Sequence, residues 1–323
     1  MPFYQSIKEY QDSDEIKWIA TRLLDLRSDL YSKIGEDKNP EAIILGSWNI
    51  RAFDGGRSRR NESFHYIAEI ISNFDICAIQ EIKPNLEPLR RLMRLLGPNW
   101  DYFVTDVTDG DAGNNERMAF LYNTNIIRFR NLIGELVIDD SPIARTPFFA
   151  SFQAGWFKFT LCNAHITFKS NDEREREIDA ISEALKKRSI KEDEMYVFLG
   201  DMNIDSIDDT TMKALQNNGF SVPLFGPTNL GGNKHYDQIA FTGEGINTKL
   251  VRYGSFDWRN TVFKTDDLDH YKPIAEVMRG KPYADWSNEY SGWTTHEMSD
   301  HLPIWVEVRT DYSDEYLKSN YLA

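Results

Sequence analysis

The sequence predicts a mixed α/β fold in which β-sheets pack on each other and helices lie outside. Seven short apolar runs have the length and residue types of buried strands, and amphipathic helical patterns fall between several of them. The chain has 323 residues, of which 41% are hydrophobic and 13% aromatic, enough to bury a large core in one large domain or two small ones. These observations are typical of layered α/β proteins.

Each expected element rests on a local pattern. Residues 14–31 carry apolar side chains at spacings of three and four, which predicts an amphipathic helix packed on the main body. Helical periodicity also predicts helices at 59–73 and 171–188, and the second has early acidic residues and late lysines that suit the helix dipole. Apolar runs of strand character predict strands at 42–48, 75–80, 117–122, 157–166, 195–200, 236–241 and 302–308.

Charge and composition limit the function classes. A formal net charge of −14 argues against tight nucleic-acid binding by bulk electrostatics, although metal ions and a few local cations would let an acidic enzyme act on a polyanion. No apolar run is long enough to span a membrane, and the N-terminus shows no secretory signal, so we expect a cytoplasmic protein. Cys77 and Cys162 lie in apolar runs, which predicts buried, reduced thiols. The oligomeric state stays open.

Polar residues with catalytic potential stand at the ends of the predicted strands. In "YVFLGDMNID" an apolar run stops at a glycine and is followed by Asp201 and Asn203. Because strand ends meet along one edge of a sheet, where α/β proteins build their sites, we expect such residues to share a cleft. The other members of this set are Asn49, Glu81, Glu116, His165, Asp237, Ser299, Asp300 and His301.

The chemistry of this set favours hydrolysis assisted by a hard cation. Carboxylates and two histidines without cysteine suit Mg²⁺ or Mn²⁺ better than zinc, and Glu81 and Asp300 are the best ligand candidates. Attack of water on a phosphodiester needs a base, a group or metal for the leaving oxygen, and donors around the phosphate oxygens. A histidine paired with a carboxylate supplies the base. The available pairs are His301 with Asp237 and His165 with Glu116.

The ordered series of motifs resembles the endonuclease/exonuclease/phosphatase superfamily over residues 43–308. Within it the chain looks most like the deoxyribonuclease I branch, because the stretch before "FLY" and the "YDQI" motif match that group. The resemblance implies a four-layered α/β sandwich with two central mixed β-sheets flanked by helices and an active site at one edge. We expect an N-terminal helical extension over 1–40, a catalytic domain over 41–310 and a C-terminal tail over 311–323. The motifs are "WNI" at 48–50, "QEI" at 80–82, "NNERMAFLYN" at 114–123, "NAHI" at 163–166, "GDMN" at 200–203, "YDQI" at 236–239 and "SDHLPI" at 299–304.

The resemblance also implies roles for single residues. Glu81 would be the principal metal ligand, assisted by Asn49 and Asp300. His301, held by Asp237, and His165, held by Glu116, would form the acid and base pair. Asp201 and Asn203 would bind the scissile phosphate, the attacking water or a second metal.

Three further residues are expected to contact substrate. Lys83 falls where the deoxyribonuclease branch carries a phosphate-contacting arginine; it keeps the charge and lacks the bidentate fork. Asn114 lies in the motif before "FLY". Arg59 lies in an arginine-rich loop at 51–61, which either binds a nucleic-acid backbone or is an ordinary solvated loop. The acidic strip at 106–116 is a possible structural Ca²⁺ site, with an ordinary surface loop favoured.

The sequence therefore predicts a Mg²⁺-dependent phosphodiesterase that cuts DNA. A phospholipid or small-phosphoester phosphodiesterase is the alternative enzyme, and a catalytically silent binding module is the alternative class. Retention of both histidines and their partners favours an active enzyme. The segment between Asp237 and Asp300, which holds Trp258, Trp286 and Trp293, is longer than the deoxyribonuclease pattern needs, and an additional packed layer is favoured over a lid or a substrate wall.

Overall fold

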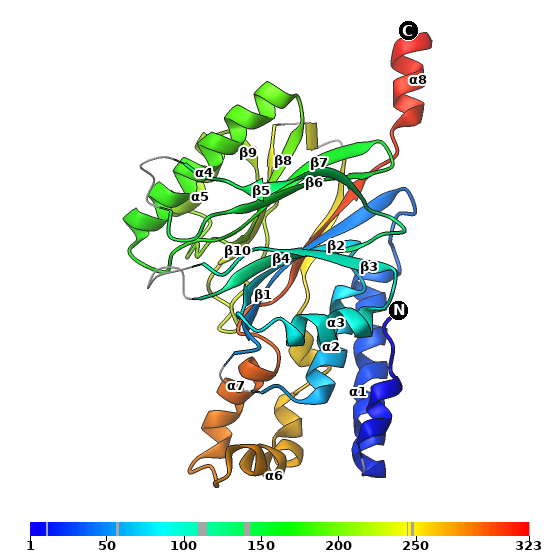
Figure 1. Ribbon diagram of the computed structural model, residues 1–323, viewed down its shortest axis with the longest axis vertical. Coiled ribbons are helices and arrows are strands. Elements are labelled where there is room, and N and C mark those ends of the chain that lie inside the picture. Colours follow the sequence, from blue (N-terminus) through cyan, green and yellow to red (C-terminus); the bar gives the residue numbers. More distant parts are fainter. Residues whose placement is uncertain are drawn as a thin grey trace.

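The computed structural model describes residues 1–10, 12–55, 58–108, 115–138, 143–243, 245–246 and 249–322. Two six-stranded sheets face each other, and helices cover both outer faces (Figure 1). The predicted four-layered α/β sandwich is therefore confirmed.

The first sheet has the strand order β11-β12-β1-β2-β4-β3. Among its described strands only β1 and β2 pair in parallel, because α2 (Asn61–Ile71) connects them as a crossover. Its strands are β1 (Ala42–Phe53), β2 (Ile76–Ile82), β3 (Trp100–Val104), β4 (Arg117–Asn123), β11 (Leu250–Ser255) and β12 (Ile304–Arg309).

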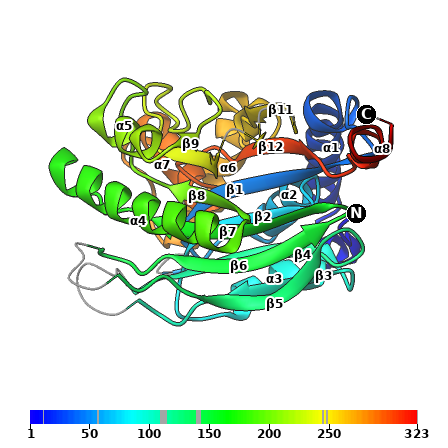
Figure 2. The ribbon, with the colours of Figure 1, turned by 90° about the horizontal axis from the view of Figure 1, so that it is seen from above.

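The second sheet has the order β5-β6-β7-β8-β10-β9 and repeats this design. Its parallel pair is β7 with β8, connected by α4 (Asn171–Glu192), which lies with α5 (Thr210–Asn217) on the outer face (Figure 2). Its strands are β5 (Arg128–Glu135), β6 (Phe148–Ala154), β7 (Phe157–His165), β8 (Met195–Asp201), β9 (Phe220–Ser221) and β10 (Asp237–Thr242).

A polar bridge joins the two sheets inside the apolar core between them. The Gln80 side chain donates a hydrogen bond of 2.7 Å to Oδ1 of Asn163, whose own Nδ2 donates to the carbonyls of Ile79 and Ala119. Gln80 and Asn163 are both fully buried. Because Glu81 directly follows Gln80 and His165 lies two residues after Asn163, this bridge sets the spacing of two candidate site residues.

Helices from both ends of the sequence cover the first sheet. The predicted N-terminal helix is α1 (Ser13–Leu30), which follows a short 3-10 helix, η1 (Gln5–Glu9), and continues into η2 (Tyr31–Gly35). Its apolar side chains pack in one cluster with α2 and α3 (Glu87–Leu96). Figure 1 shows α1 and α2 on the same side of the sandwich as α6 and α7.

The long segment before Asp300 is a packed layer, as predicted. It contains η4 (Trp258–Asn260), η5 (Thr265–Asp267), α6 (Leu268–Arg279) and α7 (Trp286–Glu297). Trp258, Trp286 and Trp293 are all buried in the cluster that also holds the apolar face of α1. Residues Ser313–Tyr321 form α8, which has no buried side chain and extends away from the sandwich (Figure 1).

Two smaller predictions can be checked on the same structure. Cys77 and Cys162 are buried and free, as expected. Among the described helices, none combines the length and the apolar character that crossing a membrane requires.

Candidate active site

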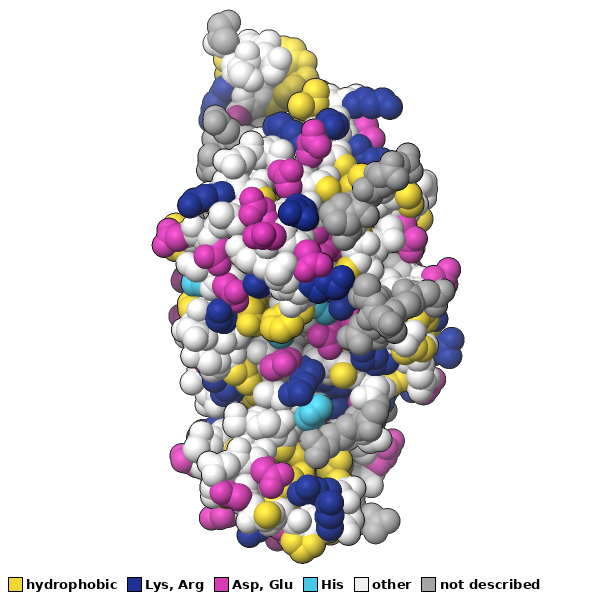
Figure 3. Space-filling view, turned by 90° about the vertical axis from the view of Figure 1, so that its left-hand side faces the viewer, with side chains coloured by type: hydrophobic (Ala, Val, Ile, Leu, Met, Phe, Trp, Pro, Cys, Tyr) yellow, Lys and Arg dark blue, Asp and Glu magenta, His cyan; other side chains and the backbone are white. Residues whose placement is uncertain are grey.

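The predicted residues converge where the two parallel strand pairs end. Strand register places His165 beside Asp201, and Asp201 beside Asp237, so three adjacent strands present these side chains in one row. On the facing sheet Asn49 is paired with Gln80, next to Glu81. Figure 3 views this edge of the molecule, where partly covered histidines lie close to acidic, basic and hydrophobic side chains.

Gly200 makes this row possible. Its φ is +131°, a value that side chains rarely tolerate, and a Cβ there would lie 2.0 Å from the carbonyl oxygen of Ala164. The glycine therefore lets β7 and β8 approach closely at the residue just before Asp201.

Glu81 and Asn49 are tied together across the first sheet. Nδ2 of Asn49 donates to Oε1 of Glu81 at 3.1 Å and to Oδ2 of Asp201 at 2.9 Å, while the Ala52 amide donates to Oε2 of Glu81 at 2.7 Å. Burial raises the pKa of Glu81, but the charge of His165 and these hydrogen bonds outweigh it, so the pKa lies below its usual range. Glu81 is therefore held as a carboxylate.

His301 forms a buried pair with Asp237. Nδ1 of His301 lies 2.8 Å from Oδ2 of Asp237, and the Ser299 hydroxyl receives the His301 amide hydrogen at 3.0 Å. Burial lowers the pKa of His301, but the charges of Asp237 and Asp201 raise it more, to about 10. The pair holds an imidazolium at neutral pH.

His165 forms the second pair with Glu116, and Arg145 joins it. Nδ1 of His165 and Nε of Arg145 each lie 2.6 Å from Oε1 of Glu116, which is 1% exposed. Burial lowers the pKa of His165, yet Glu116 and Asp201 raise it above its ordinary value.

Asp201 lies between the two imidazoles. Its Oδ2 is 3.4 Å from Nε2 of His165 and 3.7 Å from Nε2 of His301. Its Oδ1 accepts the Asn203 amide hydrogen at 3.0 Å, and Nδ2 of Asn203 donates to the Ile166 carbonyl at 2.8 Å. Burial raises the pKa of Asp201 above its usual range although both histidines oppose this.

The donor set fits a divalent cation bound through oxygen. Oδ1 of Asn49 and Oδ1 of Asp237 are buried and have no hydrogen-bond partner among the described residues, which is costly unless a cation or water satisfies them. Carboxylate and carbonyl oxygens are the ligands that Mg²⁺ prefers. Two groups have ligand atoms within 4.8 Å of one another, namely Glu81, Glu116 and His165, and Asp201, Asp237 and His301.

Asp300, Lys83 and Arg59, which the sequence also predicts as site residues, lie outside these two groups. Asp300 belongs to neither; its side chain is 46% exposed, with Nε of Arg51 3.9 Å from it. Nζ of Lys83 lies 3.9 Å from Glu116, at the margin of the site. Asn114 lies outside the described residues. The same holds for residues 109–114 of the strip at 106–116 that was predicted as a possible Ca²⁺ site.

Arg59 is buried and does not reach the surface of the candidate site. Its side chain is 2% exposed, and its guanidinium donates to the Arg51 carbonyl and to Asp54. The guanidinium therefore supports the loop after β1 from inside, where it has no access to a substrate.

The sequence did not predict that Arg145 belongs to the candidate site, nor that Glu177 holds the backbone next to it. Its Nη1 donates to the carbonyl of His165 at 3.1 Å, in addition to the contact with Glu116. The neighbouring backbone is held by the fully buried Glu177 of α4, which accepts hydrogen bonds from the amides of Ala144 and Thr167. A lone arginine before a strand carries no spacing signal that would have identified it.

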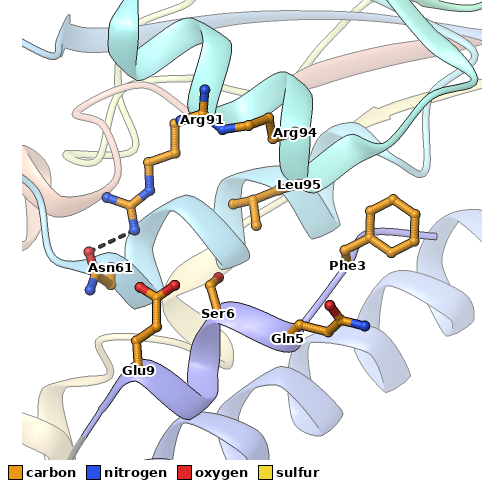
Figure 4. A pocket seen from close by; sticks show the side chains of 8 residues that line it. All are labelled: Phe3, Gln5, Ser6, Glu9, Asn61, Arg91, Arg94 and Leu95. Carbon is orange, nitrogen blue, oxygen red and sulfur yellow. Dashed lines mark hydrogen bonds between the residues drawn. The ribbon is translucent and has the colours of Figure 1, made fainter.

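A separate pocket of about 700 Å³ lies beside the N-terminal segment (Figure 4). Its lining includes Arg91, whose Nη2 donates to Oδ1 of Asn61 at 2.7 Å, and Arg94. None of the predicted site residues lines it, and the carboxylate of Glu9 faces into the same space. The pocket therefore lies apart from the clustered carboxylates and imidazoles.

Solved structures share this fold at low sequence identity. A truncated TDP2 from Caenorhabditis elegans has 14% identity and a TM-score of 0.54, with 84% of this chain and 99% of that chain covered. A mannosyl-6-phosphatase from Bacteroides thetaiotaomicron VPI-5482 has 16% identity and a TM-score of 0.54, with 82% and 99% covered. The human nocturnin catalytic domain with bound sulfate has 12% identity and a TM-score of 0.54, with 84% and 95% covered. At these identities the likeness concerns the fold alone.

The family follows from the sequence itself. No curated protein matches the chain. A family model does match, over residues 46–300, which include every predicted site residue except His301. The predicted resemblance is confirmed at this level, and the chain belongs to the endonuclease/exonuclease/phosphatase family.

Proposed function

We propose that the protein is a divalent-metal-dependent phosphodiesterase that hydrolyses DNA. The observation that carries this proposal is the position of Asp201 between the two imidazoles, with Oδ2 3.4 Å from His165 and 3.7 Å from His301. Each imidazole is backed by its own buried carboxylate. Such a site offers two imidazoles and one carboxylate to a single tetrahedral phosphate.

Glu81 and Asn49, whose side chains are linked at 3.1 Å, are the residues that would hold the cation, and Oδ1 of Asn49 is a buried oxygen without a hydrogen-bond partner among the described residues. A bound Mg²⁺ or Mn²⁺ would supply Lewis-acid stabilisation of charge on the phosphate oxygens. Asp300 lies at the margin and would join only if its exposed carboxylate turned inward.

The chain's own groups divide the remaining work. The pKa of His301 is raised to about 10, so at neutral pH its Nε2 hydrogen is available to a non-bridging or leaving oxygen of a phosphodiester, and the raised pKa of His165 favours its protonated form. Asp201 is the base in this proposal, because burial raises its pKa and its Oδ2 faces the same space. The Asn203 amide holds the other oxygen of Asp201 and thereby its orientation.

The test is cleavage of supercoiled plasmid and circular single-stranded DNA with Mg²⁺, with Mn²⁺ and with EDTA. We expect metal-dependent cleavage that is lost in His301→Ala. The exposed pair of Lys17 with Asp14 offers a control, and Asp14→Asn should cleave like the wild type. A folded, metal-loaded protein that cleaves neither DNA would overturn the proposal.

A small phosphoester is the second candidate substrate. The observation that favours it is the pairing of cations at the site margin, where Lys83 and Arg145 both face Glu116 and so offer little free charge to a long polyanion. Hydrolysis of p-nitrophenyl phosphate or its diester, without any cleavage of DNA, would select this alternative.

A further inference from the structure

Six basic side chains near the candidate site, all in the described part of the chain, already have acidic partners. We call the six of them the rim cations, and each lies within 4 Å of a carboxylate oxygen. The pairs are Arg51 with Asp300, Lys83 and Arg145 with Glu116, Lys169 with Glu173, and Arg174 and Lys234 with Asp205. Duplex DNA is bound chiefly through phosphates that replace counterions with Lys and Arg. In the described part of the chain, this rim is therefore poorly suited to a duplex.

Two aromatic residues lie near the two site histidines, Phe168 close to His165 along the chain and Tyr236 in ring contact with His301. Phe168 is 71% exposed and follows His165 by three residues, which places its Cα at most about 11 Å from that of His165. The Tyr236 ring lies 5.6 Å from the His301 ring at an interplanar angle of 35°. The site thus offers ring faces where it lacks free charge.

The backbone that presents Phe168 is fixed on both sides. Before it, Nδ2 of Asn203 donates to the Ile166 carbonyl at 2.8 Å, and the Thr167 amide donates to Oε2 of the buried Glu177 at 2.9 Å. After it, the chain enters α4 through a capping box. Because the segment is already ordered, contact with a ligand costs little further conformational entropy.

We propose that the enzyme prefers single-stranded to duplex DNA, because Phe168 stacks on a base next to the cleaved phosphodiester. This inference rests on the proposed function. The bases of a duplex are paired and stacked, so their faces are closed to a protein ring, whereas an unpaired strand exposes them. Stacking on aromatic side chains is tolerant of sequence and does not depend on free cations.

The experiment measures binding and turnover separately. Fluorescein-labelled single-stranded DNA and the same sequence as a duplex are titrated into His301→Ala protein with Mg²⁺, and anisotropy gives the two dissociation constants. Phe168→Ala, Phe168→Leu and Phe168→Trp are compared in that background and in the active enzyme. Trp156→Ala is the matched control, since Trp156 is 45% exposed and β7 separates it from His165 by about 30 Å.

We expect single-stranded DNA to bind at least about tenfold more tightly than the duplex, and Phe168→Ala to remove about tenfold of that affinity. Phe168→Trp should retain the preference, Phe168→Leu should lose most of it, and Trp156→Ala should change nothing. The affinity for the single strand should fall only weakly with salt, because few phosphates are contacted.

Equal binding of the two DNAs, or an unchanged preference in Phe168→Ala, overturns the inference. In either case the proposed function still stands if the wild-type enzyme cleaves DNA. A Phe168→Leu variant that behaves like the wild type overturns stacking in favour of simple apolar contact. Absence of both cleavage and binding overturns the proposed DNA substrate and the preference with it.

Discussion

Nδ1 of His301 lies 2.8 Å from Oδ2 of Asp237, and Asp237 is completely buried. The carboxylate is the larger of the charges that raise the pKa of His301 to about 10 against the effect of burial. It also fixes which ring nitrogen faces Asp201, at 3.7 Å. One contact thus sets both the charge and the orientation of this imidazole.

Asp237→Asn tests this contact. The amide keeps the size of the side chain but removes its charge, so the pKa of His301 should fall and turnover should drop by about 10²- to 10⁴-fold, the usual range for acid–base catalysis. The measurement is kcat and kcat/KM across pH for wild type and variant. An Asp237→Asn enzyme with the wild-type rate and pH profile would show that the pair is structural only.

Glu81→Gln tests the metal site. The amide oxygen can still accept the Ala52 hydrogen bond, so the fold should persist while the anionic ligand is lost. We expect Mn²⁺ binding, measured by calorimetry, to weaken at least about tenfold and turnover to fall with it. Glu87→Gln removes an exposed carboxylate at the start of α3 and should leave both unchanged. Equal Mn²⁺ affinity in wild type and Glu81→Gln would remove Glu81 from the ligand set.

The clustering of most candidate site residues was predictable because strand periodicity is local. A buried run that ends in a polar residue places it at the sheet edge whatever the rest of the fold does, which is why His165, Asp201 and Asp237 were found. The strands β1, β2, β7 and β8 were predicted from similarly local patterns, since they are apolar on both faces, but their pairing was not.

The parts that escaped prediction depend on distant contacts or weak patterns. Edge strand β5 is largely exposed, so its apolar alternation is faint, and the apolar β6 was not recognised as its hairpin partner. Arg145 reaches Glu116 only because Glu177 of α4 holds the adjoining backbone. Arg59 points inward to the Arg51 carbonyl, a direction that no local pattern encodes.

Arg145→Met tests the support of the second pair. It removes one of the two 2.6 Å contacts of the buried Glu116 and the hydrogen bond from Arg145 to the His165 carbonyl, so the free energy of unfolding should fall by about 3 kcal/mol. Turnover should fall as well, because Glu116 orients His165. Urea denaturation and steady-state rates are the measurements. Arg94→Met, which breaks an exposed pair with Glu87, should not shift the unfolding midpoint; an equally small effect of Arg145→Met would contradict the assigned role.

Glu297 gives a prediction for pH and stability. Burial raises the pKa of this carboxyl from 4.5 to about 7, although the Ser63 hydroxyl and the Arg60 amide both donate to it. The folded state therefore binds the proton more tightly than the unfolded chain does. Its contribution to stability is full below pH 4.5 and is lost as the pH rises through 7, a change of about 3 kcal/mol.

Glu297→Gln should remove this dependence. Relative to wild type, the variant should gain about 3 kcal/mol of unfolding free energy between pH 4.5 and pH 7.5, as measured by urea denaturation. Glu289→Gln on the same helix, whose carboxylate is 40% exposed, should show a flat difference. A flat difference for Glu297→Gln too would mean that the carboxyl titrates alike in both states.

Gly200→Ala tests how the row of site residues is built. An alanine would have to adopt a φ of +131° and place its Cβ 2.0 Å from the Ala164 carbonyl oxygen, so β7 and β8 would have to separate at the edge. We expect a loss of at least about 3 kcal/mol of unfolding free energy. His165 and Asp201, which lie on these two strands, should move apart and turnover should fall beyond what reduced stability explains. Gly226→Ala is the matched control, since a Cβ there meets nothing within 4 Å. If Gly200→Ala retained wild-type stability and turnover, close approach of the two strands would not be what brings His165 and Asp201 together.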